Sequence, residues 1–186
     1  MIFRKAIKED IECVAAIYAG VCACDAQGLT QVGWRRDIYP TKLTAETALA
    51  RDDLFVAEQD GEIVGTAIIN QVQVDVYAGA SWSVDAAADE IMVLHTLAIS
   101  PNTFGRGYGK AFVEFYEQYA LENGCRHLRM DTNRTNARAR AMYKNLGYTE
   151  IGIVPCKFNG IDGIELVLLE KELKNTKKYG FCCDNY

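Results

Sequence analysis

The sequence lacks the features that mark secreted, membrane-spanning and nucleic-acid-coating proteins. Its apolar runs last only a few residues, and the beginning, MIFRKAIKED, becomes charged at once, so we expect no signal peptide and no membrane partner. A net charge of −5 disfavours a nucleic-acid partner. The seven cysteines form neither a CxxC pair nor an even ladder. We therefore expect no metal site, reduced thiols and a cytoplasmic location.

What the sequence does have is the composition of one globular domain. Hydrophobic residues make up 49 % and charged residues 24 % of 186 residues, which is ordinary for a folded protein of this size. No repeat or low-complexity linker divides residues 1–173, so we expect a single domain there. The tail, residues 174–186, carries no hydrophobic period and is expected to be loosely structured. Nothing in the composition decides between a monomer and a homodimer.

Hydrophobic periodicity predicts elements in the order β-α-α-β-β-β-α-β-α-β-β, a mixed α/β layer fold. Thr44 is expected to cap a short helix, and residues 54–71 are typical of a hairpin that turns at Asp60-Gly61. The apolar run EIMVLHTLAIS, residues 90–100, predicts a buried central strand. Residues 72–89 predict an irregular connection or an extra pair of strands.

Residues 103–112, TFGRGYGKAF, set three glycines just before a helical pattern. Glycine lets backbone amides approach an anion closely, and a helix start adds partial positive charge, so the stretch predicts a phosphate-binding loop. A Walker loop is excluded because Ala111 follows Gly109-Lys110 where Ser or Thr is required. A dinucleotide GxGxxG is excluded because its third glycine position, counted from Gly105, is Lys110. A tight turn between two packed elements remains the alternative.

The stretch LHTLAISPNTFGRGYGKAF, followed by DTNRTNARARAMYKNLGY, resembles the central strand, pyrophosphate loop and next helix of the GNAT superfamily of N-acetyltransferases. The matching residues of the second block are Asn136, Ala139, Tyr143, Gly147 and Tyr148. The resemblance, which covers residues 90–150, implies a mixed, mostly antiparallel central sheet with helices on both faces. It also implies an enzyme that uses acetyl-CoA and releases CoA. The chain departs from the family pattern at Phe104, where Gln or Arg is usual.

The resemblance also implies which residues bind the cofactor. Backbone groups of Leu97 and Ile99 would pair with the pantetheine amides, and Asn136 would both cap its helix and bind the cofactor. The candidates come from the central strand, the glycine loop and the second block: Leu97, Ala98, Ile99, Phe104, Gly105, Arg106, Gly107, Tyr108, Gly109, Lys110, Asn136, Arg138, Ala139 and Tyr143. Arg134 and Arg140 add to the local positive charge, although a solvated helix face would carry the same residues.

The same resemblance makes Tyr143 the acid that protonates the leaving thiolate, with a core tyrosine as the alternative. The general base is left open between His95 and Glu90. His95 lies two residues before Leu97, so in an ideal strand both point to one face, and its ordinary pKa suits proton transfer. Glu90 has the opposite parity, so both residues would reach the site only across a bulge.

The acceptor side is expected to use Trp34, Tyr39, Tyr77 and Trp82, because the segments that carry them combine aromatic residues with acids. This mixture suits an amine with an apolar body, and it equally suits an exposed loop. The predicted reaction is direct attack by a primary amine of a small molecule in a ternary complex. The alternatives are a peptide or protein N-terminus or lysine as the acceptor, and a non-catalytic CoA-binding sensor.

Overall fold

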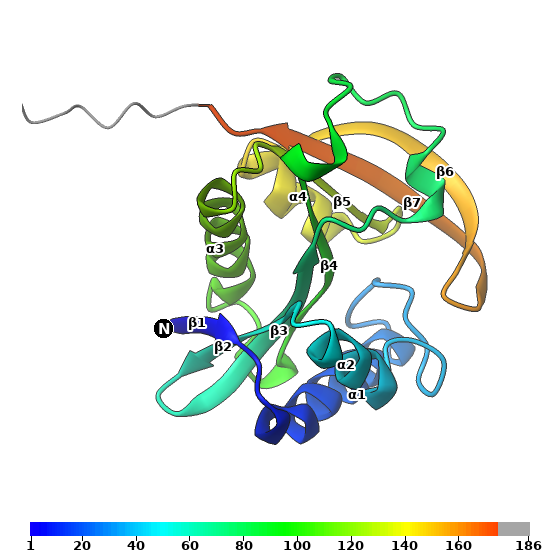
Figure 1. Cartoon of the computed structure of the whole chain (residues 1–186). Helices are drawn as coiled ribbons and strands as arrows, with labels where there is room; N and C mark the ends of the chain where they lie inside the picture. The colour runs from blue at the N-terminus through cyan, green and yellow to red at the C-terminus, as the bar shows by residue number, and fades with distance from the viewer. Residues whose placement is uncertain (175–186) are drawn as a thin grey trace, which may run out of the picture.

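The computed structural model describes residues 1–174, so all but the first residue of the tail predicted at residues 174–186 lies outside the described residues. Strands and helices follow in the predicted order (Figure 1). They are β1 (Ile2–Lys5), α1 (Ile11–Ala26), α2 (Lys42–Ala50), β2 (Leu54–Gln59), β3 (Glu62–Asn70), β4 (Ile91–Ile99), α3 (Tyr108–Glu122), β5 (His127–Asn133), α4 (Ala137–Asn145), β6 (Thr149–Phe158) and β7 (Ile161–Glu172). None of the helices in this part of the chain is long and apolar enough to span a bilayer.

The strands form one seven-stranded sheet in the order β1-β2-β3-β4-β5-β7-β6, with β4 at its centre. All neighbouring pairs are antiparallel except β4 and β5, which run parallel. The mixed, mostly antiparallel sheet expected from the sequence is therefore confirmed, and so is the central place of residues 90–100.

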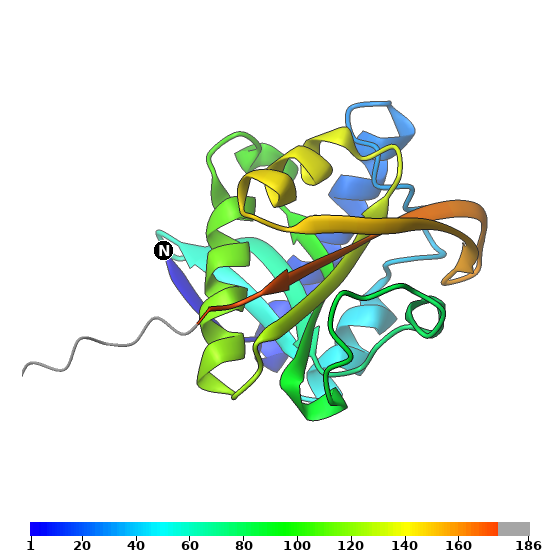
Figure 2. The same cartoon turned by 90° about the horizontal axis from the view of Figure 1, so that it is seen from above.

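Helices cover both faces of the sheet (Figure 2). Side chains alternate along β2, so that Phe55 joins the core cluster under α3 and α4, while Leu54 and Val56 join the cluster under α1 and α2. On α3, Phe112 and Tyr116 are fully buried against the first face. Burial of this helical stripe, rather than helix propensity, holds α3 on the sheet.

One local expectation is wrong, and for a second segment the structure decides between two predicted alternatives. Thr44 does not cap α2: the cap is Thr41, whose hydroxyl accepts from the Thr44 N–H at 3.4 Å, so the helix begins three residues earlier than the sequence suggested. Residues 72–89 form an irregular connection with two short 3₁₀ turns, Asp75–Tyr77 and Ala88–Glu90, and no extra strand pair.

The parallel pairing of β4 and β5 is short, and its end leaves a space between the two strands. It runs from Ile91 opposite His127 to Leu94 opposite Met130 and then stops, although both strands continue. Beyond that point the two strands part. The backbone groups of the last five residues of β4 therefore have no ladder partner on β5.

Candidate active site

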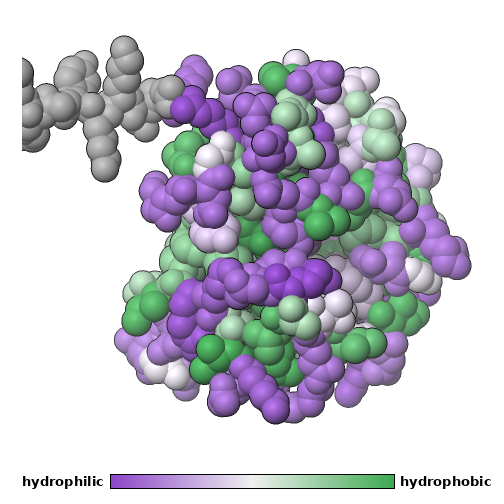
Figure 3. All heavy atoms as spheres, in the orientation of Figure 1, coloured by the Kyte–Doolittle hydropathy of each residue, from purple (hydrophilic) through white to green (hydrophobic). Residues whose placement is uncertain are grey.

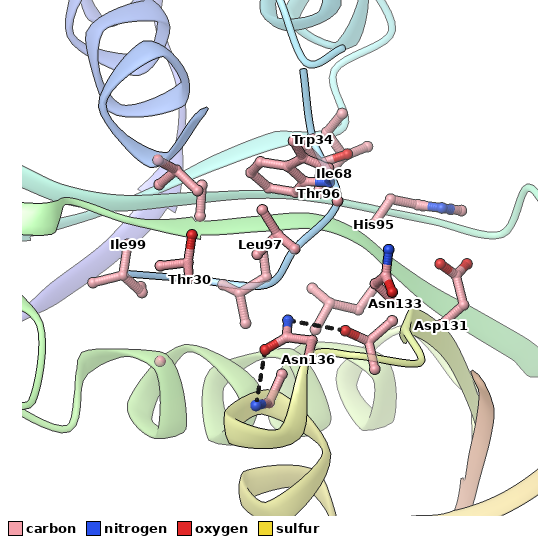
Figure 4. A pocket seen from close by; sticks show the side chains of 18 of the residues that line it. Thr30, Trp34, Ile68, His95, Thr96, Leu97, Ile99, Asp131, Asn133 and Asn136 are labelled. Atoms are coloured by element: carbon pink, nitrogen blue, oxygen red, sulfur yellow. Dashed lines mark hydrogen bonds between the residues drawn. The ribbon is translucent and has the colours of Figure 1, made fainter. Parts of the chain in front are cut away.

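A cavity of about 1180 Å³ opens where β4 and β5 part. Its walls come from the segment between α1 and α2, from β4 and the residues after β3, from the loop before α3, and from α4 and the β6–β7 hairpin. Figure 4 shows the side chains of Leu97 and Asn136 near its centre, with Asp131 and His95 at one end. The volume is large for a small ligand alone and suits a long cofactor together with an acceptor.

The glycine loop forms one end of the cavity. Gly105 and Gly107 have φ angles of 85° and 83°, a left-handed conformation that glycine adopts without strain. Gly107 is the N-terminal residue before α3, so the first N–H groups of the helix and the loop amides border the cavity. At Gly109 a Cβ atom would lie 3.4 Å from the Met142 sulfur, so this glycine permits the close approach of α3 and α4. Arg106 is exposed and does not line the cavity.

The first turn of α4 faces the same end. Asn136 caps this helix as expected: its Oδ1 accepts from the Ala139 N–H at 3.3 Å, while its Nδ2 donates to Thr132 at 3.2 Å (Figure 4). The Arg138 guanidinium lies 5.4 Å from the ring centre of Phe104. Phe104 stands where the resemblance led us to expect Gln or Arg, and Arg138 of α4 places a cation beside this uncharged residue.

Tyr143 lies at the α4 wall with its ring packed against Tyr148, at 5.9 Å between ring centres. Its side chain belongs to the core cluster under α3 and α4, and it also lines the cavity. The hydroxyl forms no hydrogen bond within residues 1–174. Burial, together with the negative charge of Asp131, raises the pKa of this phenol above its ordinary value, so it keeps its proton at neutral pH.

A bulge in β4 overturns the expectation that His95 and Leu97 share a face. The register with β3 shifts opposite residues 96 and 97, and Thr96 has a φ of 52°. As a result Leu94 and Leu97 both pack on the α3 side, whereas His95 lies on the other side of the sheet. The alternation rule that the sequence prediction used holds only for a strand without such an insertion.

His95 lines the cavity, and its ring is held by Asn70. Asn70 donates from Nδ2 to Asp53 at 2.7 Å, and its Oδ1 accepts from the Val72 N–H at 2.9 Å. That same Oδ1 lies 3.1 Å from His95 Nε2, so by this network the imidazole proton is assigned to Nε2, which donates to Asn70. Burial lowers the pKa of His95 to about 4, so the ring is neutral at physiological pH.

The other predicted site residues divide into two groups. Trp34 and Tyr39 line the cavity, and the Tyr39 hydroxyl hydrogen-bonds the Thr96 hydroxyl. Glu90 does not line the cavity. It is exposed in a 3₁₀ turn at the opposite end of β4 and accepts from the Ala87 N–H at 3.3 Å. Tyr77 and Trp82 also lie outside the cavity lining, because residues 72–89 fold onto the sheet.

Trp82 and Tyr77 each make one contact with β5 that fixes this loop to the sheet, and one hydrogen bond joins the two residues. The Arg129 guanidinium lies 4.1 Å from the ring centre of Trp82, and the Trp82 indole N–H donates to the Tyr77 carbonyl at 3.0 Å. The Tyr77 side chain is 2 % exposed, and its hydroxyl donates to Oδ2 of Asp131 at 2.7 Å. The aromatic residues expected to contact an acceptor thus support a residue that does line the cavity.

Sequence reasoning missed that residue, Asp131. It lies on β5 next to Met130, is half-buried, and is the one carboxylate among the described residues that line the cavity. Burial raises its pKa to about 6, and the Tyr77 hydrogen bond partly opposes this rise. The available signal was the alternation in HLRMDT, where an acid follows buried Leu128 and Met130 inside a strand.

A segment after α1 closes one side of the cavity. The Asp25 carboxylate accepts from Thr30 at 3.0 Å and from the Val32 N–H at 2.8 Å, which folds this segment back on the helix end. Gly33 has a φ of 74°, a left-handed conformation that favours glycine, where the segment passes the Asn133 side chain of β5. No group of three potential ligands gathers for a metal ion within residues 1–174.

Comparison with known proteins adds a family match. Residues 25–148 match the model described as the acetyltransferase (GNAT) family. An uncharacterized N-acetyltransferase of Archaeoglobus fulgidus is 29 % identical over 147 residues, which cover 77 % of this chain and 89 % of that protein. One of Methanocaldococcus jannaschii is 28 % identical over 103 residues, which cover 55 % of this chain but only 42 % of that protein.

Solved structures show the same fold. A GNAT-family acetyltransferase from Streptococcus agalactiae superposes with a TM-score of 0.76 at 22 % identity, covering 94 % of this chain and 96 % of that one. The protein yncA from Salmonella typhimurium, whose structure was solved with its cofactor acetyl-CoA, gives a TM-score of 0.64 at 18 % identity, covering 97 % and 98 %. At these identities the likeness concerns the arrangement of the chain.

Proposed function

The chain belongs to the acetyltransferase (GNAT) family, and we propose that it transfers the acetyl group of acetyl-CoA to the primary amine of a small molecule. The amine would attack the thioester directly in a ternary complex. One observation carries the proposal: a single cavity joins an amide-rich, cationic end at the start of α3 to an apolar end that holds one carboxylate. These are the chemistries of a phosphorylated cofactor and of an amine.

The residues present fit acetyl-CoA as the cosubstrate. Loop amides at Gly105 and Gly107, with the dipole of α3, would hold the pyrophosphate, and Lys110 and Arg138 add positive charge there. The unpaired edge of β4 offers backbone groups to the pantetheine amides, as in an added strand. The whole proposed set is Leu97, Ala98, Ile99, Phe104, Gly105, Gly107, Tyr108, Gly109, Lys110, Asn136, Arg138 and Ala139, with exposed Arg106 at its edge.

The proposed chemistry needs two further groups on this side. The Leu97 backbone amide would stabilise the negative charge that develops on the thioester carbonyl oxygen. Tyr143 would donate its proton to the departing sulfur: its free hydroxyl lines the cavity, and its raised pKa keeps the proton in place until a strong base, the thiolate, forms beside it.

The acceptor end supports a small amine with an apolar body. Trp34, Tyr39 and Phe158 line it, with ring centres 6.3 Å apart for the first pair and 5.6 Å for the second. The rim carries Ile38, Leu43 and Val72, which are 46 %, 68 % and 62 % exposed. Hydrophobic patches are visible in the lower part of Figure 3, where α1 and α2 lie in Figure 1. Exposed aliphatic side chains around an opening favour an apolar ligand.

Release of CoA thiol across a panel of acceptors tests the proposal. The panel holds 2-phenylethylamine, hexylamine, glycine, lysine and a short peptide with a free N-terminus, each with acetyl-CoA. We expect turnover with the apolar amines. Turnover with the peptide alone would replace the small amine by a peptide acceptor. Binding of acetyl-CoA without turnover on any acceptor would indicate a sensor, and no binding would overturn the proposal altogether.

A further inference from the structure

Resting on the proposed function, we propose that Asp131, supported by Tyr77, binds the ammonium group of the acceptor and then accepts its proton. The acceptor would accordingly be a primary amine that enters in its protonated form, with an apolar body. The inference assigns the base to β5 instead of to His95 or Glu90 on the β4 side.

Position is the first argument. Leu94 and Met130 are the last residues at which β4 and β5 pair, so Asp131 is the first residue of β5 beyond the point where the strands part. Met130 packs in the cluster under α3 and α4, so Asp131 points to the other face of the sheet, on which His95 also lies (Figure 4). Tyr143 stands on the α3 side. A group held between the strands would therefore have the acid on one face and the carboxylate on the other.

Charge is the second argument. Oδ2 of Asp131 accepts the Tyr77 hydrogen bond at 2.7 Å, and a hydroxyl is a neutral partner. No lysine or arginine within residues 1–174 forms an ion pair with Asp131. A carboxylate that is withdrawn even in part from water and has no cation beside it is unfavourable in free energy, and an ammonium ion that enters the cavity would supply the missing charge.

The titratable groups around Asp131 are all neutral at physiological pH. They come from every element packed against it: Tyr39 from the α1–α2 segment, Tyr77 from residues 72–89, His95 from β4, Tyr143 from α4 and Cys156 from β6. The negative charge of Asp131 contributes to the raised pKa of Tyr39, Tyr143 and Cys156. Among these groups Asp131 is thus the single one that is ionised, once it loses its proton. Arg51 also lines the cavity, but its charge is paired with Asp53 at 2.8 Å.

His95 is a weaker candidate for the same role. Its Nε2 proton is engaged by Asn70, and a pKa of about 4 makes the ring a poor proton acceptor at neutral pH. Asp131 has the opposite property: a pKa of about 6 makes it a stronger base than an ordinary carboxylate, while it is still mostly ionised near neutrality.

The proposed proton transfers balance. The ammonium gives one proton to Asp131, and the neutral amine nitrogen forms its bond to the acetyl carbon as the carbon–sulfur bond breaks. The sulfur takes the Tyr143 proton, and the phenolate recovers a proton from the newly bonded nitrogen, directly or through water. Asp131 then releases its proton to solvent, so that one ammonium and one thioester become one amide, one thiol and one proton.

The test uses the full chain and three variants: Asp131→Asn, Tyr77→Phe and the control Asp60→Asn, an exposed turn residue far from the cavity with a φ of 55° that Asn also tolerates. For 2-phenylethylamine, we expect kcat/KM of the parent protein to rise with pH through an apparent pKa near 6, the value given for Asp131. Asp131→Asn should lower turnover roughly 10²–10⁴-fold and remove this rise, the acid limb of the pH–rate profile. Tyr77→Phe should move the acid limb to higher pH, because the Tyr77 hydrogen bond lowers the pKa of Asp131.

A binding measurement keeps the inference independent of turnover. With CoA bound, 2-phenylethylamine should stabilise the parent protein against heat more than 2-phenylethanol does, and Asp131→Asn should abolish the difference. Equal stabilisation by amine and alcohol, or an unchanged acid limb in a folded Asp131→Asn variant, would overturn the assignment while the acetyltransferase proposal stands. If Asp131→Asn does not fold, the limb shift in Tyr77→Phe decides. Absence of turnover in the parent protein would overturn the proposed function itself.

Discussion

Leu94 and Met130 face each other as the last paired residues of β4 and β5, and the next residues along the two strands are His95 and Asp131. Up to this pair all the paired residues of β4, and Leu128 and Met130 of β5, are buried and apolar. Beyond it each strand presents a polar side chain to the cavity. His95 is satisfied by Asn70, whereas Asp131 has only a hydroxyl partner. Just beyond the end of this parallel pairing, one polar residue is thus held by the protein itself, and the other, Asp131, is left able to bind a ligand.

Acetyl-CoA and CoA should each stabilise the protein, because the loop amides and the start of α3 converge only in the folded state. At a ligand concentration about 100 times the dissociation constant, the gain in the free energy of unfolding should be roughly 2.7 kcal/mol. A thermal unfolding series with each ligand measures it. A shift with another nucleotide but with neither of these would contradict the cofactor assignment.

Gly107→Asp should weaken CoA binding at least about tenfold, equivalent to about 1.4 kcal/mol, since a carboxylate would stand where the pyrophosphate approaches. Gly61→Asp is a matched control: the φ angles are 83° and 82°, and a Cβ meets nothing within 4 Å at either position. Both variants should lose a similar 1–2 kcal/mol or so of stability from left-handed strain. Calorimetric titration with CoA separates them; equal affinities would mean that the loop is only a turn.

Tyr143→Phe should lower turnover roughly 10²–10⁴-fold and change CoA affinity little, because it deletes only the hydroxyl and keeps the packed ring. Tyr148→Phe is the control. That ring contacts Tyr143, and its buried hydroxyl has no hydrogen-bond partner, so its removal should leave both activity and stability nearly intact. Small, equal losses in the two variants would make Tyr143 a core residue.

His95→Gln should keep the acid limb of the pH–rate profile and lose less activity than Asp131→Asn. A glutamine amide can still donate to Asn70, and the ring that it replaces, with a pKa of about 4, would not titrate near neutrality. Glu90→Gln should behave like the parent protein, since Glu90 lies outside the cavity. Steady-state rates from pH 5 to 9 measure the profiles of both variants. Loss of the acid limb in His95→Gln would mean that His95 on β4 is the general base.

Asp131→Asn should stabilise the protein above pH 6. The folded-state pKa of about 6 exceeds the ordinary value of 3.8, so the folded protein holds this proton more tightly than the unfolded chain does. Its stability therefore falls as pH rises from about 4 to 6 and stays reduced above that, by up to roughly 3 kcal/mol. Denaturant unfolding at pH 4 and pH 7.5 should show the gain at the higher pH only. A loss at pH 7.5 would mean that Asp131 is structural.

The sequence by itself determined the order of the elements, the central strand and the loop before α3. These follow from local patterns: the apolar run of residues 90–100 has no wet face, and three closely spaced glycines before an amphipathic stripe leave few other structures open. The helix cap at Asn136 is equally local, since a side chain bonds a backbone group three residues ahead.

Only the tertiary structure decided which polar residues meet in the cavity. A one-residue bulge at Thr96 reversed the face of everything after it in β4, and no sequence pattern announces such an insertion. Tyr77 and Asp131 are 54 positions apart, and they meet because the contact of Trp82 with Arg129 holds residues 72–89 against the sheet. Strand parting and cross-strand contacts depend on long-range packing, which periodicity along one strand does not encode.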